Sequence, residues 1–180
     1  MQFTQTRPEA YGLTARIGLT LAAAALIALG AKVQVPFWPV PMTLQTLAVL
    51  VIAAGLGPRM GLAAMGAYMA AGLAGLPVFA GSPERGLGLA YLAGPTTGFL
   101  IGMALAMVVT GWLAARGGMA ARAVAMLAGT VAIYVPGLIW LSAFVPADRL
   151  LAVGVAPFLL GDLFKIAVGT LALQLLSRRG

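Results

Sequence analysis

The sequence predicts an all-α integral membrane protein, built as a compact bundle of six transmembrane helices. Of its 180 residues 62% are hydrophobic and only 8% are charged, whereas soluble domains carry about 25% charged residues. Its apolar segments have the length of a membrane-spanning helix, and the short alternating strands of a membrane β-barrel are missing. We expect one membrane domain over residues 1–180, without a soluble module.

Six predicted spans follow from these apolar segments and from the turn residues between them. A proline-rich stretch over residues 35–41 precedes the second span, and Gly57-Pro58-Arg59 predicts a tight connection into the third. A longer, more polar loop over residues 77–93 precedes the fourth. The predicted spans cover residues 13–30, 42–56, 60–76, 94–114, 123–144 and 155–176.

The basic residues near the span ends predict the orientation. Only Lys32, Arg85 and Arg149 fall on one side of the predicted membrane, beside Glu84 and Asp148. Cytoplasmic loops carry the excess of Lys and Arg, so we expect both termini in the cytoplasm and a multi-pass protein of the cytoplasmic membrane. The opposite, more basic side holds Arg7, Arg16, Arg59, Arg116, Arg122, Arg178 and Arg179.

Composition also excludes several classes of function. The net charge is +7, but the basic residues are scattered at span ends without a basic patch interleaved with aromatics, so no nucleic acid partner is expected. The chain has no Cys and no His, which removes disulfides, common zinc sites and histidine-based catalysis. We expect no cofactor and no metal. A signal peptide at the first span is disfavoured because five more spans follow.

Two ionisable residues stand inside the sixth predicted span. Asp162 and Lys165 are three residues apart and therefore lie on one face of a helix. Each charge at the centre of a membrane helix costs roughly 2.5–3.5 kcal/mol on insertion scales. The pair could merely neutralise itself as a salt bridge, but buried pairs contribute little net stability. We therefore interpret Asp162 and Lys165 as part of a ligand site.

Other polar groups are expected on the same, outer side of the membrane. Gln45 lies one turn into the second span, while Arg85 and Tyr91 lie in the loop before the fourth. Each has a simpler interpretation: Gln45 could bond across helices, Arg85 could pair with Glu84, and Tyr91 could be an interfacial aromatic. Together they predict a pocket open to the outside, with the loops over residues 32–41 and 77–93 as candidate lids.

Several short motifs in order resemble the BioY family, the biotin-specific substrate-binding components of energy-coupling-factor transporters. The run over residues 40–50, VPMTLQTLAVL, is similar to the family signature VPFTLQTLA. The resemblance extends from about residue 12 to the C-terminus. The other matching blocks are Gly57-Pro58-Arg59, Gly75 to Gly81, Gly94 to Gly98 and Gly161 to Lys165.

This resemblance implies a vitamin-capture protein that works with a transmembrane coupling protein and a pair of ABC ATPases. It implies that Asp162, Lys165 and Gln45 contribute to the biotin site. It also implies that a ridge including Ala24 and Ala28 contacts the coupling protein. The chain departs from the family at two positions of the fourth span. Thr97 stands in place of a second glycine and Phe99 in place of a frequent tyrosine. Close packing of the fourth helix and a tyrosine contact there therefore do not follow from the resemblance.

The sequence therefore predicts biotin capture from outside the cell by a protein that is not itself an enzyme. Biotin offers ureido N–H groups to a carboxylate and a carboxylate to a cation, and which end meets which residue stays open. Alternatives are a capture subunit for another vitamin, a glycine-packed channel, or a membrane enzyme, which the lack of His and Cys disfavours. A homo-oligomer also stays open.

Overall fold

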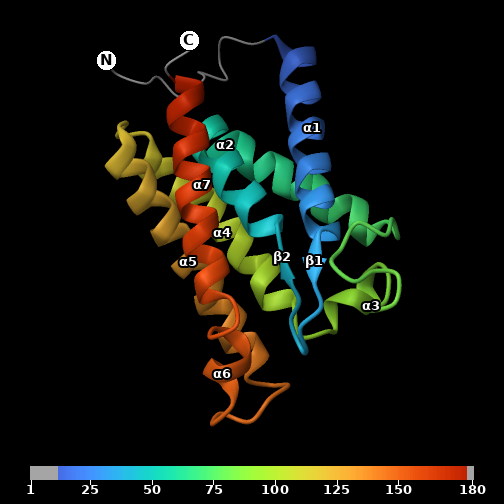
Figure 1. Ribbon diagram of the computed structural model, residues 1–180. Coiled ribbons are helices and arrows are strands. Elements are labelled where there is room, and N and C mark those ends of the chain that lie inside the picture. Colours follow the sequence, from blue (N-terminus) through green and yellow to red (C-terminus); the bar gives the residue numbers. More distant parts are fainter. Residues whose placement is uncertain (1–11, 178–180) are drawn as a thin grey trace.

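The structure is a computed structural model and describes residues 12–177; Arg7, Arg178 and Arg179 lie outside this range. It is a helical bundle (Figure 1) with one small antiparallel hairpin, in which Gln34 pairs with Thr43 and Val35 with Met42. The elements in order are α1 (Leu13–Lys32), β1 (Gln34–Val35), β2 (Met42–Thr43), α2 (Gln45–Leu73), α3 (Leu89–Leu92), α4 (Thr97–Ala114), α5 (Met119–Leu141), α6 (Leu150–Gly154) and α7 (Leu159–Ser177).

Five segments of the described chain are long and apolar enough to cross a membrane, namely α1, α2, α4, α5 and the α6–α7 segment. The α2 segment is two helices, because Gly57 inside it adopts φ 79° and breaks the helical path. Only glycine takes this conformation without strain, and Pro58 follows at a position where a helix can start. Counted separately, the two halves of α2 give the six predicted helices.

Several helices begin or end away from the predicted bounds. Met42 and Thr43 belong to the hairpin, so α2 begins only at Gln45. The sixth span is divided into α6 and α7, and Pro157 lies in the break, where its missing N–H cannot support a continuous helix. The fifth helix begins earlier than predicted, at Met119, directly after two glycines with positive φ.

The bundle centre is formed by α4, which packs most extensively against α5 and α2. Two glycines of α4 make this contact possible. A Cβ atom on Gly102 would lie 2.4 Å from the Ile133 carbonyl oxygen, and one on Gly98 would lie 2.4 Å from that of Pro136. Gly94 belongs to the predicted fourth span but lies before α4, so it takes no part in this contact between α4 and α5. The fourth helix therefore packs closely although Thr97 replaces a glycine of the family pattern, because Gly98 and Gly102 allow the close contact.

The two ends of the bundle differ (Figure 1). The start of α1 and the end of α7 lie at one end, while the hairpin, α3 and α6 lie at the other. Apolar side chains cover much of the outside, including Leu160 at 83% exposure and Ile139 at 70%. Such a surface suits lipid rather than water. Helix α1 is the least enclosed of the described membrane helices, since it packs chiefly against α2.

Candidate functional site

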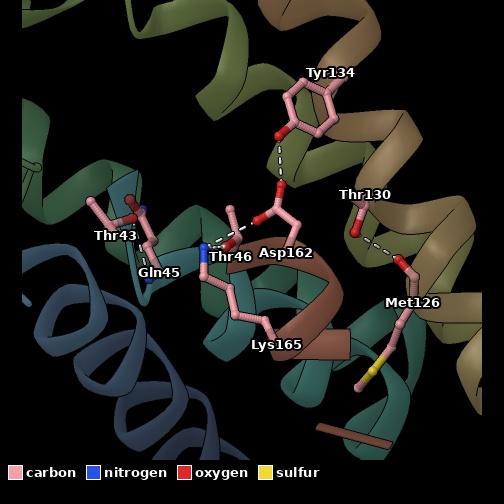
Figure 2. Close-up of polar contacts among 8 residues, drawn as sticks. All are labelled: Thr43, Gln45, Thr46, Met126, Thr130, Tyr134, Asp162 and Lys165. Atoms are coloured by element: carbon pink, nitrogen blue, oxygen red, sulfur yellow. Dashed lines mark hydrogen bonds and ion pairs between the residues drawn. The ribbon is translucent and has the colours of Figure 1, made fainter. Parts of the chain in front are cut away.

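The buried pair Asp162 and Lys165 lies on the inward face of α7 (Figure 2), with 9% and 6% of its surface exposed. The Lys165 Nζ atom lies 3.1 Å from Asp162 Oδ1 and donates a second hydrogen bond of 3.0 Å to Thr46 Oγ1 of α2. On the other side, the Tyr134 hydroxyl of α5 donates to Asp162 Oδ2 at 2.5 Å. The pair therefore joins three helices through charge-assisted hydrogen bonds.

A small cavity of about 60 Å³ lies directly beside this pair. Its polar lining comes from Asp162, Lys165, Tyr134 and three threonines, and the rest is apolar. An apolar pocket with a few convergent polar groups is the usual form of a small-molecule site. The remaining wall is formed by Val40, Pro41, Met42, Phe99, Met103, Ile133 and Phe158.

A second cavity of about 30 Å³ lies around Gln45 and Tyr91. The Gln45 side chain is 2% exposed, and its Nε2 atom has no hydrogen-bond partner among the described residues. A buried N–H group without a partner costs about 1–3 kcal/mol, so this donor is available to an acceptor that enters the cavity. The two cavities share five lining residues, namely Val40, Pro41, Thr43, Phe99 and Met103.

The hairpin β1–β2 and its turn border both cavities through Val40, Pro41 and Thr43. Its turn is held by Arg85, whose guanidinium donates to the carbonyl oxygens of Pro39 at 2.7 Å and Phe37 at 3.4 Å. The same guanidinium lies 5.3 Å from the Trp38 ring. On the opposite side, Phe37 makes an edge-to-face contact with Phe158, between α6 and α7, with ring centroids 6.0 Å apart. The hairpin is thus fastened at two points.

The loop over residues 77–93 is itself fastened to α1 and to the core. Lys32 donates to the carbonyl oxygens of Phe79 and Ser82 at 3.0 and 2.8 Å. The Phe79 ring stacks on Tyr91, with centroids 4.5 Å apart. Burial raises the pKa of Tyr91, so its hydroxyl stays protonated near neutral pH and donates to the Ala80 carbonyl at 2.9 Å. The two predicted lids therefore form one connected cap.

The structure brings some of the predicted site residues together and separates others. Asp162 and Lys165 line the first cavity, and Gln45 and Tyr91 line the second. Arg85 lines neither cavity, because its guanidinium is bound to the hairpin backbone. A contact between Arg85 and a bound ligand therefore has no support in this geometry, and its position instead gives it a role in holding the cap.

The structure also places the two residues of the ridge predicted on α1. Ala24 is 9% exposed and belongs to the hydrophobic core, and Ala28 packs against that core from a partly buried position. The reason is the rotation of α1, which turns both side chains toward α2. The small residues with exposed positions on α1 include Ala15, Gly18, Ala22 and Ala25.

Two residues that bind the charged pair were missed in the sequence. Tyr134 lies in the middle of an apolar span, where a buried phenol needs a hydrogen-bond partner, and this was a usable signal. Thr46 gave no signal of its own, because a threonine hydroxyl in a helix can equally bond a carbonyl of its own helix. Its contact with Lys165 depends on how α2 and α7 cross, which the sequence pattern does not specify.

Comparison with known proteins agrees with this architecture. The model of the BioY family matches residues 4–180. A probable biotin transporter BioY of Pyrococcus horikoshii is 35% identical, with 85% of this chain and 90% of that protein covered. The biotin transporters BioY of Thermotoga maritima and Rhodobacter capsulatus are 40% and 36% identical, over 82% and 88% of this chain and 86% and 90% of their own lengths.

One solved structure has the same fold. It is the S-component for biotin from an ECF-type ABC transporter, and it superposes with a TM-score of 0.81 over 93% of each chain. Its sequence identity of 24% is low, so this likeness supports the helical membrane fold and carries no statement about individual side chains.

Proposed function

Because the chain belongs to the BioY family, we propose that it captures biotin from outside the cell. It acts in the cytoplasmic membrane as the substrate-binding component of an energy-coupling-factor transporter and leaves the vitamin chemically unchanged. The observation that carries this proposal is the buried Asp162–Lys165 pair beside a cavity that the hairpin closes. Both termini face the cytoplasm in this proposal, as the excess of arginine at that end favours.

The ureido end of biotin suits the charged pair better than the carboxylate end does. A ureido group presents an N–H donor next to a carbonyl acceptor, which complements the Asp162 carboxylate and the Lys165 ammonium at the same time. A carboxylate would complement Lys165 only and would be repelled by Asp162, whose Oδ1 is 3.1 Å from the ammonium. We therefore assign the ureido ring to Asp162 and Lys165.

The valerate chain then extends toward the second cavity. Gln45 offers a buried N–H without a described partner there, and a carboxylate is the stronger acceptor for such a donor. Phe99 and Met103 line both cavities and give the apolar wall that the thioether ring and the alkyl chain require. Tyr91 completes the far wall of this assigned path.

The two cavities must widen before biotin fits. Their volumes of about 60 and 30 Å³ are well below the roughly 300–1,000 Å³ of pockets for ligands of drug size. Methionine adapts its shape easily, so movement of Met103 and Phe99 can join the two cavities. The hairpin supplies the entrance, because releasing Arg85 from Pro39 and Phe37 frees its turn.

Transport across the membrane needs partners in this proposal. No Walker A motif occurs in the chain, so ATP hydrolysis belongs to a pair of ABC ATPases that act through a transmembrane coupling protein. The exposed face of α1 with Gly18, Ala22 and Ala25 is the surface we assign to that coupling protein, since small residues let helices approach closely in a membrane.

The proposal is tested by equilibrium binding of radiolabelled biotin to the purified chain. We expect saturable binding that excess thiamine or riboflavin does not displace. The variant Asp162→Asn should lose about 2–5 kcal/mol of binding free energy, because a buried charged contact loses one partner. The matched variant Asp148→Asn changes an exposed loop carboxylate and should bind as wild type. Equal biotin affinity of Asp162→Asn and wild type would reject the assigned site.

A further inference from the structure

A third cavity lies far from the proposed biotin site, between the first turns of α1 and the second half of α2. It has a volume of about 320 Å³ and shares no lining residue with the two cavities described above. Its volume is therefore larger than that of either of them, and exposed residues of α1 and α2 line it. Its described lining residues are Leu13, Arg16, Ile17, Thr20, Leu21, Arg59, Met60 and Ala63.

The groove has a charged part and an apolar part. Arg16 and Arg59 provide two exposed guanidinium groups, and its described lining contains no acidic residue. Leu13, Ile17 and Leu21 are 73%, 52% and 59% exposed. They recur at spacings of four residues on one face of α1, so the apolar part runs along the helix axis for about 12 Å.

Both parts lie at the end of the bundle that carries the described arginines of the predicted cytoplasmic side. Arg16 and Arg59 line one groove at the start of α1, and Arg122 donates to Gln174 and Ser177 near the end of α7. The start of α1 and the end of α7 lie at the same end of the bundle (Figure 1). The lipids of a cytoplasmic leaflet are partly anionic, and basic pockets between membrane helices on that side bind lipid headgroups.

We propose that this groove binds an anionic phospholipid of the cytoplasmic leaflet. The headgroup phosphate lies between Arg16 and Arg59, and one acyl chain lies along Ile17 and Leu21 toward the membrane centre. Guanidinium groups bind phosphate oxygens with paired hydrogen bonds. Each has five N–H donors, so other contacts of these arginines within the protein are compatible with the lipid. The elongated apolar wall explains why a lipid fits better than free phosphate.

The test uses the full-length protein purified in neutral detergent and native mass spectrometry of its lipid adducts. The probes are phosphatidylglycerol and phosphatidylcholine with identical acyl chains. We expect the wild type to retain phosphatidylglycerol preferentially, and excess inorganic phosphate not to displace it. A basic side chain near an anionic surface suggests a loss of about fivefold for each of Arg16→Gln and Arg59→Gln, and of about thirtyfold for both together.

Two controls separate the groove from a general effect of charge or folding. Arg116→Gln removes an arginine from the same end, where its guanidinium lies 4.5 Å from the Trp112 ring outside the groove, and should leave adduct formation unchanged. Ala63→Phe fills the groove without changing the charge and should weaken phosphatidylglycerol retention. Ala70→Phe, on the exposed surface of the same helix, should not. Biotin binding should be unchanged in all six variants, which verifies the fold independently of the lipid.

Three results would overturn the proposal. One is equal retention of the two lipids by the wild type, and another is unchanged retention in the double arginine variant. The third is equal loss of lipid retention in Arg116→Gln and in the groove variants, which would indicate a general effect of charge. Unchanged retention in the double variant together with reduced ATPase-coupled uptake would assign the groove to the coupling protein. Failure of the wild type to bind biotin would refute the proposed function and leave these lipid measurements interpretable.

Discussion

The Tyr134 hydroxyl of α5 donates a hydrogen bond to Asp162 of α7, with 2.5 Å between the hydroxyl oxygen and Oδ2. The other carboxylate oxygen, Oδ1, is engaged by Lys165 of the same helix as Asp162. Both oxygens are thus held in fixed directions, one by a neighbouring helix and one by the helix itself. This fixes the carboxylate that we assign to the ureido ring before any ligand arrives, which lowers the entropic cost of binding.

The Tyr134→Phe variant tests this support. It leaves Oδ2 of a buried carboxylate without its donor, and hydrogen bonds to charged groups contribute about 1.5–3 kcal/mol. We expect the free energy of unfolding in detergent to fall by about that amount and biotin affinity to fall with it. The matched variant Ser142→Ala removes a hydroxyl that only bonds the Ile139 carbonyl of its own helix, and it should change neither quantity. A Tyr134→Phe protein as stable as wild type would contradict the assignment.

The orientation of biotin is tested by comparing biotin with its methyl ester. The ratio to compare is the dissociation constant of the methyl ester divided by that of biotin. If the ureido ring meets Lys165, Lys165→Met weakens the binding of both ligands by the same factor, so this ratio stays as in wild type. Gln45→Leu should lower that ratio toward one, because Gln45 is assigned to the carboxylate. The reverse pattern, with the ratio reduced in Lys165→Met only, would place the carboxylate at the charged pair. Competition binding with radiolabelled biotin measures both constants.

The cap predicts a kinetic effect of Arg85. Arg85→Gln removes a charged donor of two hydrogen bonds to the hairpin, so the open cap becomes more populated. We expect biotin to dissociate faster, on the order of tenfold, measured by chasing bound radiolabelled biotin with unlabelled biotin. The acceleration should be equal for biotin and its methyl ester. A loss confined to biotin would indicate that Arg85 contacts the ligand carboxylate. Arg149→Gln is the matched control.

The glycine contact between α4 and α5 predicts a steric effect. A Cβ atom at position 102 meets the backbone of Ile133 at 2.4 and 2.7 Å, and backbone cannot move aside as a flexible side chain can. Gly102→Ala should therefore destabilise the protein by about 1–3 kcal/mol or more. Gly66→Ala is the control, because nothing lies within 4 Å of its Cβ position, and it should be neutral or stabilising by up to about 1 kcal/mol. Thermal unfolding in detergent measures both, and equal midpoints would refute this interpretation.

The sequence predicted the elements of this fold that depend on local composition. Apolar length identified the membrane helices, and Gly57-Pro58 identified the turn between the second and third, because both signals act over a few residues. The charged pair was equally visible, since two ionisable residues stand out in an apolar helix. Its inward direction is now observed, with Asp162 and Lys165 both buried.

What the sequence could not predict depends on how helices rotate and cross. The periodicity of an apolar helix does not reveal which side faces protein and which faces lipid, since both sides are apolar. For this reason the sequence could not show that Ala24 packs into the core of the bundle. For the same reason the contact between Tyr134 and Asp162, which are 28 residues apart in the sequence, could not be predicted. The hairpin was also missed, because its strands are only two residues long.

The partition between the two cavities has an evolutionary consequence. Phe99 and Met103 line both cavities from α4, and the neighbouring Gly98 and Gly102 hold the backbone of this helix against α5. Exchanging Met103 can therefore reshape the chamber while these glycine contacts remain, whereas Phe99 also packs on Gly137 of α5. A transporter of this design can diverge toward new vitamins through very few substitutions, and its scaffold need not be reinvented each time.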